Sequence, residues 1–406
     1  MKTGQLLQQC NSYLKLFCEE ISERSVGSEG NRRATRFFEQ EISSCGWQTE
    51  TEEFDAIDWE DGGAQLVAGD ESFTVQVSPY SLGCKVEAPL LAAASRAELE
   101  RLSTTGKILL LYGPITREQL MPKNFLFYNP REHQQIIALL EQSGPAAIIC
   151  ATGRNAALAG GVYPFPLIED GDFDIPSVFM TEDEGKRLLP RAGSTVALQS
   201  QSRRIPGKSY NVIARKGEPS NQRIVITAHI DAKKGTPGAI DNATGVIVLL
   251  LLARLLADYS GDRQLEIVAL NGEDYYAVPG QMLYLRHNQD HFAEIILNIN
   301  IDGAGYLEGN SAFSFYGLPG DIREHTAEVM NRFVGIVEGV QWQQGDHSIF
   351  TQNGCPAIAV SSEWFTDNIA EQENTHTSAD NSAIVDSSKV VEIAEALNLL
   401  IRKLTQ

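Results

Sequence analysis

Cysteine is scarce in this sequence, and its spacing matches no metal-binding or redox motif. The 406 residues include six cysteines, and no two of them form a CxxC pair. Several lie in apolar stretches such as AAIIC, which is typical of reduced thiols in a protein core. Reduced thiols fit a cytoplasmic protein, and we predict that location. The six are Cys10, Cys18, Cys45, Cys84, Cys150 and Cys355.

Basic residues and long apolar runs are also scarce. There are 33 Lys and Arg against 53 Asp and Glu, a formal net charge of -20, which argues against nucleic-acid or anionic-membrane partners. The longest apolar run, residues 246–253, is too short to span a bilayer. The first twenty residues lack the apolar segment and cleavage site of a secretory signal. We therefore expect a soluble globular protein with no nucleic-acid or membrane partner.

The chain does have ample material for a hydrophobic core. Hydrophobic residues make up 43% of it, and its length predicts two domains, or one domain with an insertion. Residues 1–55 resemble the start of an α/β domain. From residue 56 to 204, short strands with frequent Gly and Pro and little helix indicate a smaller inserted domain. The first domain is expected to resume over residues 205–406.

Buried strands alternate with helices in this last part of the chain. The segments RIVITAHI, QLEIVAL, IILNINID and CPAIAVS are apolar almost throughout, and helices are expected at 243–258, at 280–288 and from about 384. This alternation predicts an α/β fold with a mostly parallel central sheet and helices on both faces. Functional residues should then lie at the carboxyl ends of the strands.

Histidines and acids follow several of these strands. Each alone has a simple structural explanation, such as a helix cap or a solvated turn. Together they are harder to dismiss, because a parallel sheet brings the carboxyl ends of its strands to one edge. These residues are His229, Asp231, Asp241, Glu273, Asp274, Asp302 and His376.

This set of side chains suits a metal site. Imidazole nitrogen and carboxylate oxygen are ligands for Zn²⁺, and one carboxylate can be shared between two ions. Asp241 is the natural bridge, because the first-turn N–H groups and dipole of the following apolar helix favour a carboxylate there. Asp231 lies on the same side of its strand as His229 and can orient that imidazole. If Asp274 binds metal, Glu273 is left to act as general base.

Five ordered motifs resemble the co-catalytic dizinc aminopeptidase family. They are AHIDAKKGTPGAIDNATGV, NGED, NINIDG, GDHSIFTQNGCPAI and HTSAD. This family includes bacterial leucyl aminopeptidases and, more distantly, glutamate carboxypeptidase II, the glutaminyl cyclases and the transferrin receptor. The resemblance is strong over residues 205–380 and weaker over 56–204, which is similar to the protease-associated domain that many members carry. It implies a zinc exopeptidase fold and an aminopeptidase acting on peptides with a free N-terminus.

The resemblance also implies roles for individual residues. Glu273 would be the general base, and two Zn²⁺ ions would be bound, although Co²⁺ or Mn²⁺ would suit the same ligand types. One ion would be held by His229, Asp241 and Asp302, and the other by Asp241, Asp274 and His376.

The chain departs from the family pattern in two places. The family usually has Glu-Glu where this chain has Glu273-Asp274. In several members a tyrosine donates to the oxyanion, but all twelve tyrosines here lie at or before Tyr316. His347 is the candidate replacement, because an imidazole N–H can also stabilise developing negative charge. The nearby Trp364 and Phe365 are expected to line a specificity wall or to pack.

Two other functions stay open on the sequence alone. A glutaminyl cyclase-like acyltransferase works with a single zinc in this family resemblance, and the five intact ligand positions argue against it. A binding protein that has lost catalysis is the second alternative, and it would have no need of Glu273. A homo-oligomer is possible.

Overall fold

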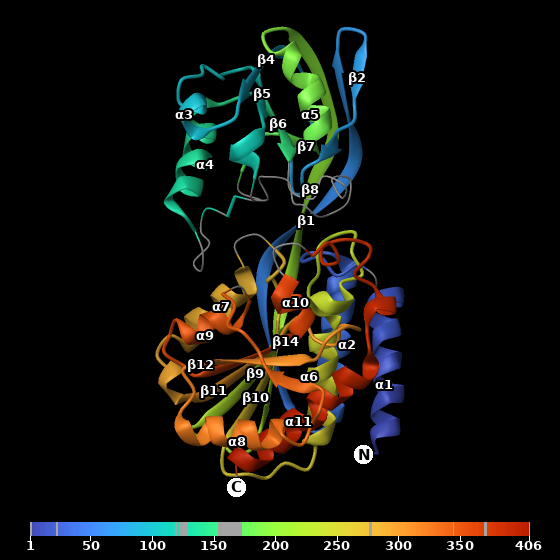
Figure 1. Cartoon of the computed structure of the whole chain (residues 1–406), viewed down its shortest axis with the longest axis vertical. Helices are drawn as coiled ribbons and strands as arrows, with labels where there is room; N and C mark the ends of the chain where they lie inside the picture. Colours follow the sequence, from blue (N-terminus) through green and yellow to red (C-terminus); the bar gives the residue numbers. More distant parts are fainter. Residues whose placement is uncertain are drawn as a thin grey trace. The chain divides into compact units, whose positions relative to one another are not determined.

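A computed structural model describes residues 2–21, 23–117, 120–121, 123, 129–152, 173–275, 278–343, 345–368 and 372–405. The chain divides into two compact units (Figure 1). The first unit comprises residues 1–55 and 208–406, and the second comprises residues 56–207.

The first unit contains a mixed, mostly parallel sheet. Its strand order is β13-β12-β14-β11-β9-β10-β8. The neighbours β10, β9, β11 and β14 are parallel, whereas β8 and β12 pair antiparallel with β10 and β14. The bounds are β8 Thr195–Lys216, β9 Arg223–His229, β10 Gln264–Leu270, β11 Ile295–Ile301, β12 Ser311–Tyr316, β13 Ile336–Glu338 and β14 Ala357–Ser362.

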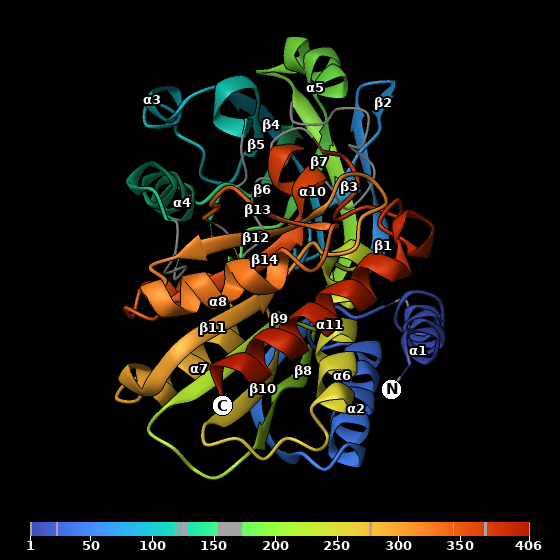
Figure 2. The same cartoon turned by 60° about the horizontal axis from the view of Figure 1, so that its bottom comes forward.

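Helices cover both faces of this sheet, as the sequence predicted. In Figure 1, α1, α2 and α6 lie to the right of the strands, and α7 and α9 lie to the left. Figure 2 shows α11 crossing beside α6. The bounds are α1 Thr3–Lys15, α2 Glu29–Ser44, α6 Thr244–Leu255, α7 Pro279–Asn288, α8 Gly320–Met330, α9 His347–Thr351, α10 Glu363–Asn368 and α11 Ser387–Leu404. The α/β fold class is therefore confirmed.

Helix α6 is apolar all round because it is buried on all sides. Residues 244–253 are each buried, and the helix contacts strands β9, β10 and β11 as well as helices α1, α2 and α11. A helix enclosed in this way needs no polar face. Its N-terminal end is preceded by the turn Ala239–Ala243, in which Asp241 and Asn242 have non-helical backbone angles, and lies at the edge of the sheet where β9 and β11 end.

The N-terminal helices are fixed by local signals. Ser28 caps α2 by accepting the Asn31 N–H at 3.0 Å, a typical N-cap contact. The helix ends before Gly46, whose φ of 77° is the left-handed conformation that favours glycine after a helix. Between α1 and α2, Arg24 is buried in the interior of the unit.

The second unit has its own sheet, with the order β8-β4-β5-β6-β7-β3, and β1 pairs with β2. Along β5, Ile108 and Leu110 enter one apolar cluster, and Leu109 and Leu111 enter another, so both faces are covered. The sequence suggested little helix here, but α3, α4 and α5 are present. The bounds are β1 Gln48–Ala68, β2 Glu71–Phe73, β3 Gln76–Val77, β4 Cys84–Ala93, α3 Arg96–Leu99, β5 Ile108–Leu111, α4 Arg131–Ser143, β6 Ala147–Thr152, β7 Ser177–Thr181 and α5 Glu182–Leu188.

The composition led to predictions about the cysteines and about membrane-spanning segments. All six cysteines are free, and four of them are buried. Within the described ranges, no helix combines the length and the apolar character needed to cross a membrane. The cytoplasmic location stays a prediction.

Candidate metal and catalytic site

The predicted site residues come from neighbouring strand ends and two loops of the first unit. His229 is the last residue of β9, Asp302 follows β11, and the Glu273-Asp274 pair follows β10. Because these three strands are parallel neighbours, their carboxyl ends share one edge of the sheet. Asp241 lies in the turn before α6, and His376 lies in the loop before α11.

Asp241 lies between the two histidines. Its Oδ1 is 3.2 Å from His229 Nε2, and its Oδ2 is 2.8 Å from His376 Nε2. Asp302 Oδ1 is 3.6 Å from His229 Nε2 on one side, and Asp274 Oδ1 is 2.9 Å from His376 Nε2 on the other. Donor atoms of His229, Asp241 and Asp274 all lie within 4.8 Å of one another. The structure thus brings all five predicted ligands together.

The donor atoms have the properties of a cation site. Both ring nitrogens of His229 and Oδ2 of Asp274 are buried and, among the described residues, have no hydrogen-bond partner, an arrangement that costs free energy unless something else binds them. The nitrogen and carboxylate donors are of the kind that Zn²⁺ accepts. The residues present therefore fit a metal ion.

The clustered carboxylates of the site also need positive charge nearby. Burial alone would lower the pKa of His229, but the surrounding carboxylates outweigh burial and raise that pKa well above its usual value. The same balance raises the pKa of His376 to about 10. Without another cation, both imidazoles would hold protons to offset the acids. A bound metal ion would supply that positive charge instead.

Glu273 stands apart from these donors. It is half-buried beside Asp274. Burial raises the pKa of Glu273 well above its usual value, His229 opposes the shift, and the charge of Asp274 adds to it. A carboxylate whose pKa is raised toward the working pH has the character of a general base, because it can both take and return a proton.

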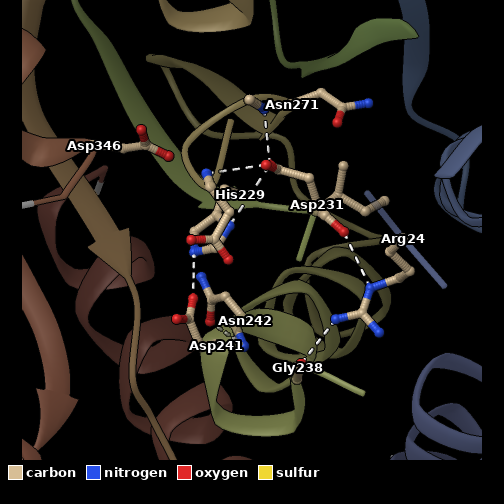
Figure 3. A network of polar contacts seen from close by, with 12 residues as sticks. Arg24, His229, Asp231, Gly238, Asp241, Asn242, Asn271 and Asp346 are labelled. Atoms are coloured by element: carbon tan, nitrogen blue, oxygen red, sulfur yellow. Dashed lines mark hydrogen bonds and ion pairs between the residues drawn. The ribbon is translucent and has the colours of Figure 1, made fainter. Parts of the chain in front are cut away.

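Asp231, which Figure 3 shows beside His229, is fully buried and bonds to the loop that carries Glu273 and Asp274. Its Oδ1 accepts the Gly272 N–H at 2.8 Å, and its Oδ2 accepts the Asp274 N–H at 3.0 Å. Its Oδ1 also lies 3.6 Å from Nδ1 of His229, which is longer than a hydrogen bond. The closest contacts of Asp231 therefore position the Glu273-Asp274 loop, a role that the sequence did not suggest.

His347, the predicted oxyanion donor, is buried and turned toward the backbone. Its Nε2 lies 3.1 Å from the Trp342 carbonyl oxygen, and its ring packs against Tyr316 and Trp342. Burial lowers the pKa of His347 to about 4, so the ring is neutral at pH 7. The carbonyl requires the proton on Nε2, which leaves Nδ1 as an acceptor. These contacts give no support to the oxyanion role, which stays a prediction from the sequence.

The aromatic residues near the site pack against the loops that carry the donors. Trp364 stacks on Tyr306 with ring centroids 4.3 Å apart, and the Asn374 side-chain amide donates to the Tyr306 hydroxyl at 3.3 Å. Phe365 approaches Gly303, where an added Cβ would lie 3.2 Å from the Phe365 ring. Both aromatics therefore have packing roles, and their part in substrate specificity stays a prediction.

Sequence reasoning missed two buried charged residues beside Asp241. Arg24 and Asp380 are 1% and 0% exposed, and Figure 3 shows Arg24 next to the turn that carries Asp241. Both bond to backbone groups of that turn. Burial and the nearby charge of Asp241 raise the pKa of Asp380 to about 7. The motif HTSAD contains Asp380, but contacts with backbone atoms leave no pattern in a sequence.

An α/β sheet whose strand ends gather two histidines and several carboxylates is an architecture of the metallopeptidase class. Residues 211–401 match the model of peptidase family M28. The family relationship expected from the motifs is thereby confirmed. The assignment of the second unit as a protease-associated domain stays a prediction.

Sequence relatives and solved structures agree with this family. The chain is 25% identical over 292 residues to the probable lipoprotein aminopeptidase LpqL of Mycobacterium tuberculosis, covering 69% of this chain and 54% of that protein. It is 27% identical over 174 residues to aminopeptidase YwaD of Bacillus subtilis, covering 41% of this chain and 35% of that protein. The matches thus span about half or less of these two relatives.

Solved structures share the fold over nearly the whole chain. The aminopeptidase from Aneurinibacillus sp. strain AM-1 superposes with a TM-score of 0.74 at 22% identity, covering 99% of this chain and 96% of that one. BSAP, a zinc aminopeptidase from Bacillus subtilis, gives a TM-score of 0.73 at 17% identity, covering 98% and 95%. At these identities the likeness establishes the fold.

Proposed function

We propose that this protein is a metal-dependent aminopeptidase that removes N-terminal residues from peptides. The observation that carries the proposal is the arrangement of Asp241 between His229 and His376 in a unit of family M28. The two sequence relatives named above are both described as aminopeptidases.

We assign the ligands as two overlapping sets that share Asp241. His229, Asp241 and Asp302 would hold one zinc ion, and Asp241, Asp274 and His376 would hold the other. The distances described above support this division, because each oxygen of Asp241 faces a different histidine. Bound zinc supplies Lewis-acid chemistry, which polarises the scissile carbonyl and makes water acidic enough to react near neutral pH.

The residues of the chain handle the proton. Glu273, whose pKa is raised by burial, would take a proton from the attacking water and return it to the leaving amine. Asp231 holds the loop that carries Glu273 through its bonds to the Gly272 and Asp274 N–H groups. Glu273 lies between Gly272 and Asp274 in the chain. Because Asp231 accepts the N–H groups of both neighbours, the backbone position of Glu273 is fixed.

The expected substrates are peptides with a free N-terminus. Their protonated amino group is attracted to a carboxylate-rich site on a chain whose net charge is -20. A blocked N-terminus removes this charge, so N-acetylated peptides should not be processed.

The proposal is tested with a mixed peptide pool, half of it N-acetylated, incubated with zinc-loaded protein and analysed by mass spectrometry. A chelator-treated sample is the control. Stepwise shortening of the free-amine peptides alone, abolished by the chelator, is the expected result. Loss of ammonia from N-terminal glutamine would identify a cyclase instead. An unchanged pool, with bound metal confirmed by elemental analysis, would favour a binding protein and contradict the proposal.

A further inference from the structure

Arg24 is a buried arginine whose guanidinium donates to four backbone carbonyls. Its guanidinium donates to the carbonyl oxygens of Phe17 at 2.6 Å, Ile230 at 3.2 Å, Pro237 at 2.7 Å and Gly238 at 2.7 Å. Within the described ranges it forms no ion pair with a carboxylate. A buried cation that is not paired directly is costly and needs compensation from nearby groups.

The turn around Gly238 is shaped to admit this guanidinium. Gly238 has φ of 56°, in the left-handed region that favours glycine. A Cβ atom at this position would lie 2.9 Å from Arg24 Nη2 and 2.5 Å from the Asp241 carbonyl oxygen. Glycine is therefore needed here for conformation and for space, and the turn can pack closely on Arg24.

Asp380 contacts the other side of the same turn. Its Oδ1 accepts the Ile240 N–H at 2.7 Å, and its Oδ2 accepts the Asp241 N–H at 3.1 Å. The Asp380 backbone carbonyl also accepts the Ala239 N–H at 3.2 Å. Both side-chain oxygens therefore accept N–H groups, an arrangement that an ionised carboxylate satisfies.

The backbone of residues 237–241 thus connects two opposite buried charges. Its first carbonyls face the guanidinium of Arg24, and its last N–H groups face the carboxylate of Asp380. The carbonyls that bond to Arg24 and the N–H groups that bond to Asp380 belong to consecutive peptide units of one turn, so each set of contacts favours the turn conformation that the other needs. The side chain fixed at the end of this turn is Asp241.

We propose that Arg24 and Asp380 are a pair of positioning residues, coupled through the backbone of residues 237–241, that hold Asp241 between His229 and His376. This inference rests on the proposed function, in which Asp241 bridges two metal ions. It assigns to the N-terminal segment, which supplies no ligand, a direct part in metal affinity.

Coupling through the turn has a specific signature. When one charge is removed, the other remains buried without compensation, so each single substitution should be costly. When both are removed, no uncompensated charge is left, and the effect should be smaller than the product of the two single effects. Two independent supports of the turn would instead give effects that multiply.

The experiment measures zinc affinity of the metal-free full chain by competition with a chromophoric chelator. The proteins are wild type, Arg24→Met, Asp380→Asn and the double variant. Each single substitution is expected to raise the zinc Kd by about 10- to 100-fold, as for partners that orient metal ligands. The zinc Kd of the double variant should be no higher than that of the single variant with the higher Kd. Kd changes below about threefold, or a double effect equal to the product, would overturn the proposal.

Arg223→Met is the matched control. Arg223 is also buried, but its charge is paired directly with Glu266, and it lies at the start of β9, whereas His229 lies at its end. This control should lose stability with no change in zinc Kd. If Arg223→Met weakened zinc binding as much as Arg24→Met, a general loss of stability would explain both and the inference would fail.

A conservative variant guards against failure to fold. Arg24→Lys keeps the positive charge opposite Asp380 but has fewer donors for the four carbonyls. Its zinc Kd should lie between the values for wild type and Arg24→Met. If Arg24→Met does not fold, the zinc Kd of Arg24→Lys should still lie within about tenfold of the wild-type value. A Kd equal to that of Arg24→Met would contradict the role of charge.

Absorption of the Co²⁺-substituted proteins adds a readout of ligand geometry. The d–d bands should change in both single variants and stay unchanged in Arg223→Met, and bands that stay unchanged in the single variants would count against the inference. If wild type takes up no zinc, the proposed function fails and this inference with it. If wild type binds zinc tightly but the single effects multiply, only the inference fails.

Discussion

At the scale of single residues, the adjacent acids Glu273 and Asp274 differ in their contacts. Asp274 faces His376 and is bonded at its N–H group by Asp231, whereas Glu273 is half-buried next to it with a raised pKa. Neighbouring residues of a turn point in different directions, so one can hold metal while the other moves protons. The two should therefore respond differently to substitution.

Replacing Glu273 by Gln should abolish turnover and leave the metal in place. The amide keeps the size of the side chain but cannot accept a proton, so we expect kcat to fall by at least about 10²- to 10⁴-fold. Zinc content, measured by elemental analysis, should equal that of wild type. Asp241→Ala is the contrasting variant and should lose zinc itself. Activity of Glu273→Gln near that of wild type would refute the assignment of the general base.

His347 should make the protein less stable in acid. Burial lowers the pKa of His347 to about 4, while in the unfolded chain it is close to 6.5. Between these values the unfolded state binds a proton that the folded state does not. Stability is therefore lost as the pH falls from about 6.5 to about 4, by up to about 3 kcal/mol.

The check compares wild type with His347→Gln, which keeps a donor for the Trp342 carbonyl but does not titrate. Urea unfolding is followed at several pH values between 4 and 7.5, and the difference in unfolding free energy is plotted against pH. The difference should shift in favour of the variant as the pH falls. A difference that is constant with pH would contradict a buried neutral His347.

The sequence predicted which residues meet at the site but not what holds them there. His229, Asp241 and Asp302 could be grouped because a parallel sheet brings strand ends to one edge, and the structure does place them together. Arg24 and Asp380 could not be grouped in this way, since they bond to carbonyl and N–H groups that every residue carries. The contact of His347 with the Trp342 carbonyl depends on loop conformation and was equally hidden.

At the scale of elements, predictions were most accurate where strands and helices alternate. The segment QLEIVAL is β10, and the helix expected at 280–288 is α7, Pro279–Asn288. The sequence analysis did not identify β12, α8 or β13. Strand β12 pairs antiparallel with β14, so it departs from the alternation that guided the other assignments. Helix α4 was hidden in the second unit by the strand-rich segments around it.

The enclosed helix α6 should be sensitive to loss of volume. Leu250 is 1% exposed, and Leu250→Ala should lower the free energy of unfolding by about 2–5 kcal/mol, because it removes buried methyl groups and leaves a cavity. Leu307→Ala is the control, since Leu307 is 51% exposed, and its effect should stay within about 0.5 kcal/mol. Chemical denaturation measures both, and equal losses would show that α6 is not tightly packed.

At the scale of the whole molecule, the chain folds as two units, and the proposed metal site belongs to only one of them. All five proposed ligands, together with Arg24 and Asp380, lie in residues 1–55 and 208–406. The change to short strands with frequent Gly and Pro could suggest an insertion, because the second unit has its own strands and its own apolar clusters. This change in composition carries no information on the function of that unit.

Zinc should stabilise the protein through the first unit. The metal binds the folded chain and offsets the repulsion among carboxylates, so zinc at 100 times its Kd should add about 2.7 kcal/mol to the free energy of unfolding. Thermal unfolding of chelator-treated protein with and without added zinc measures this effect. Asp241→Ala should show little or no shift, and a shift as large as that of wild type would mean that zinc acts elsewhere.

The distance along the chain between Arg24 and Asp380 has a consequence for synthesis. Arg24 is synthesised well before Asp380, and His376 lies only four positions before Asp380. A growing chain carries His229 and Asp241 long before it carries the groups that complete their surroundings. The cluster can therefore be completed only after His376 and Asp380 have been synthesised, and a chain that ends before His376 lacks one of the two histidines of the cluster.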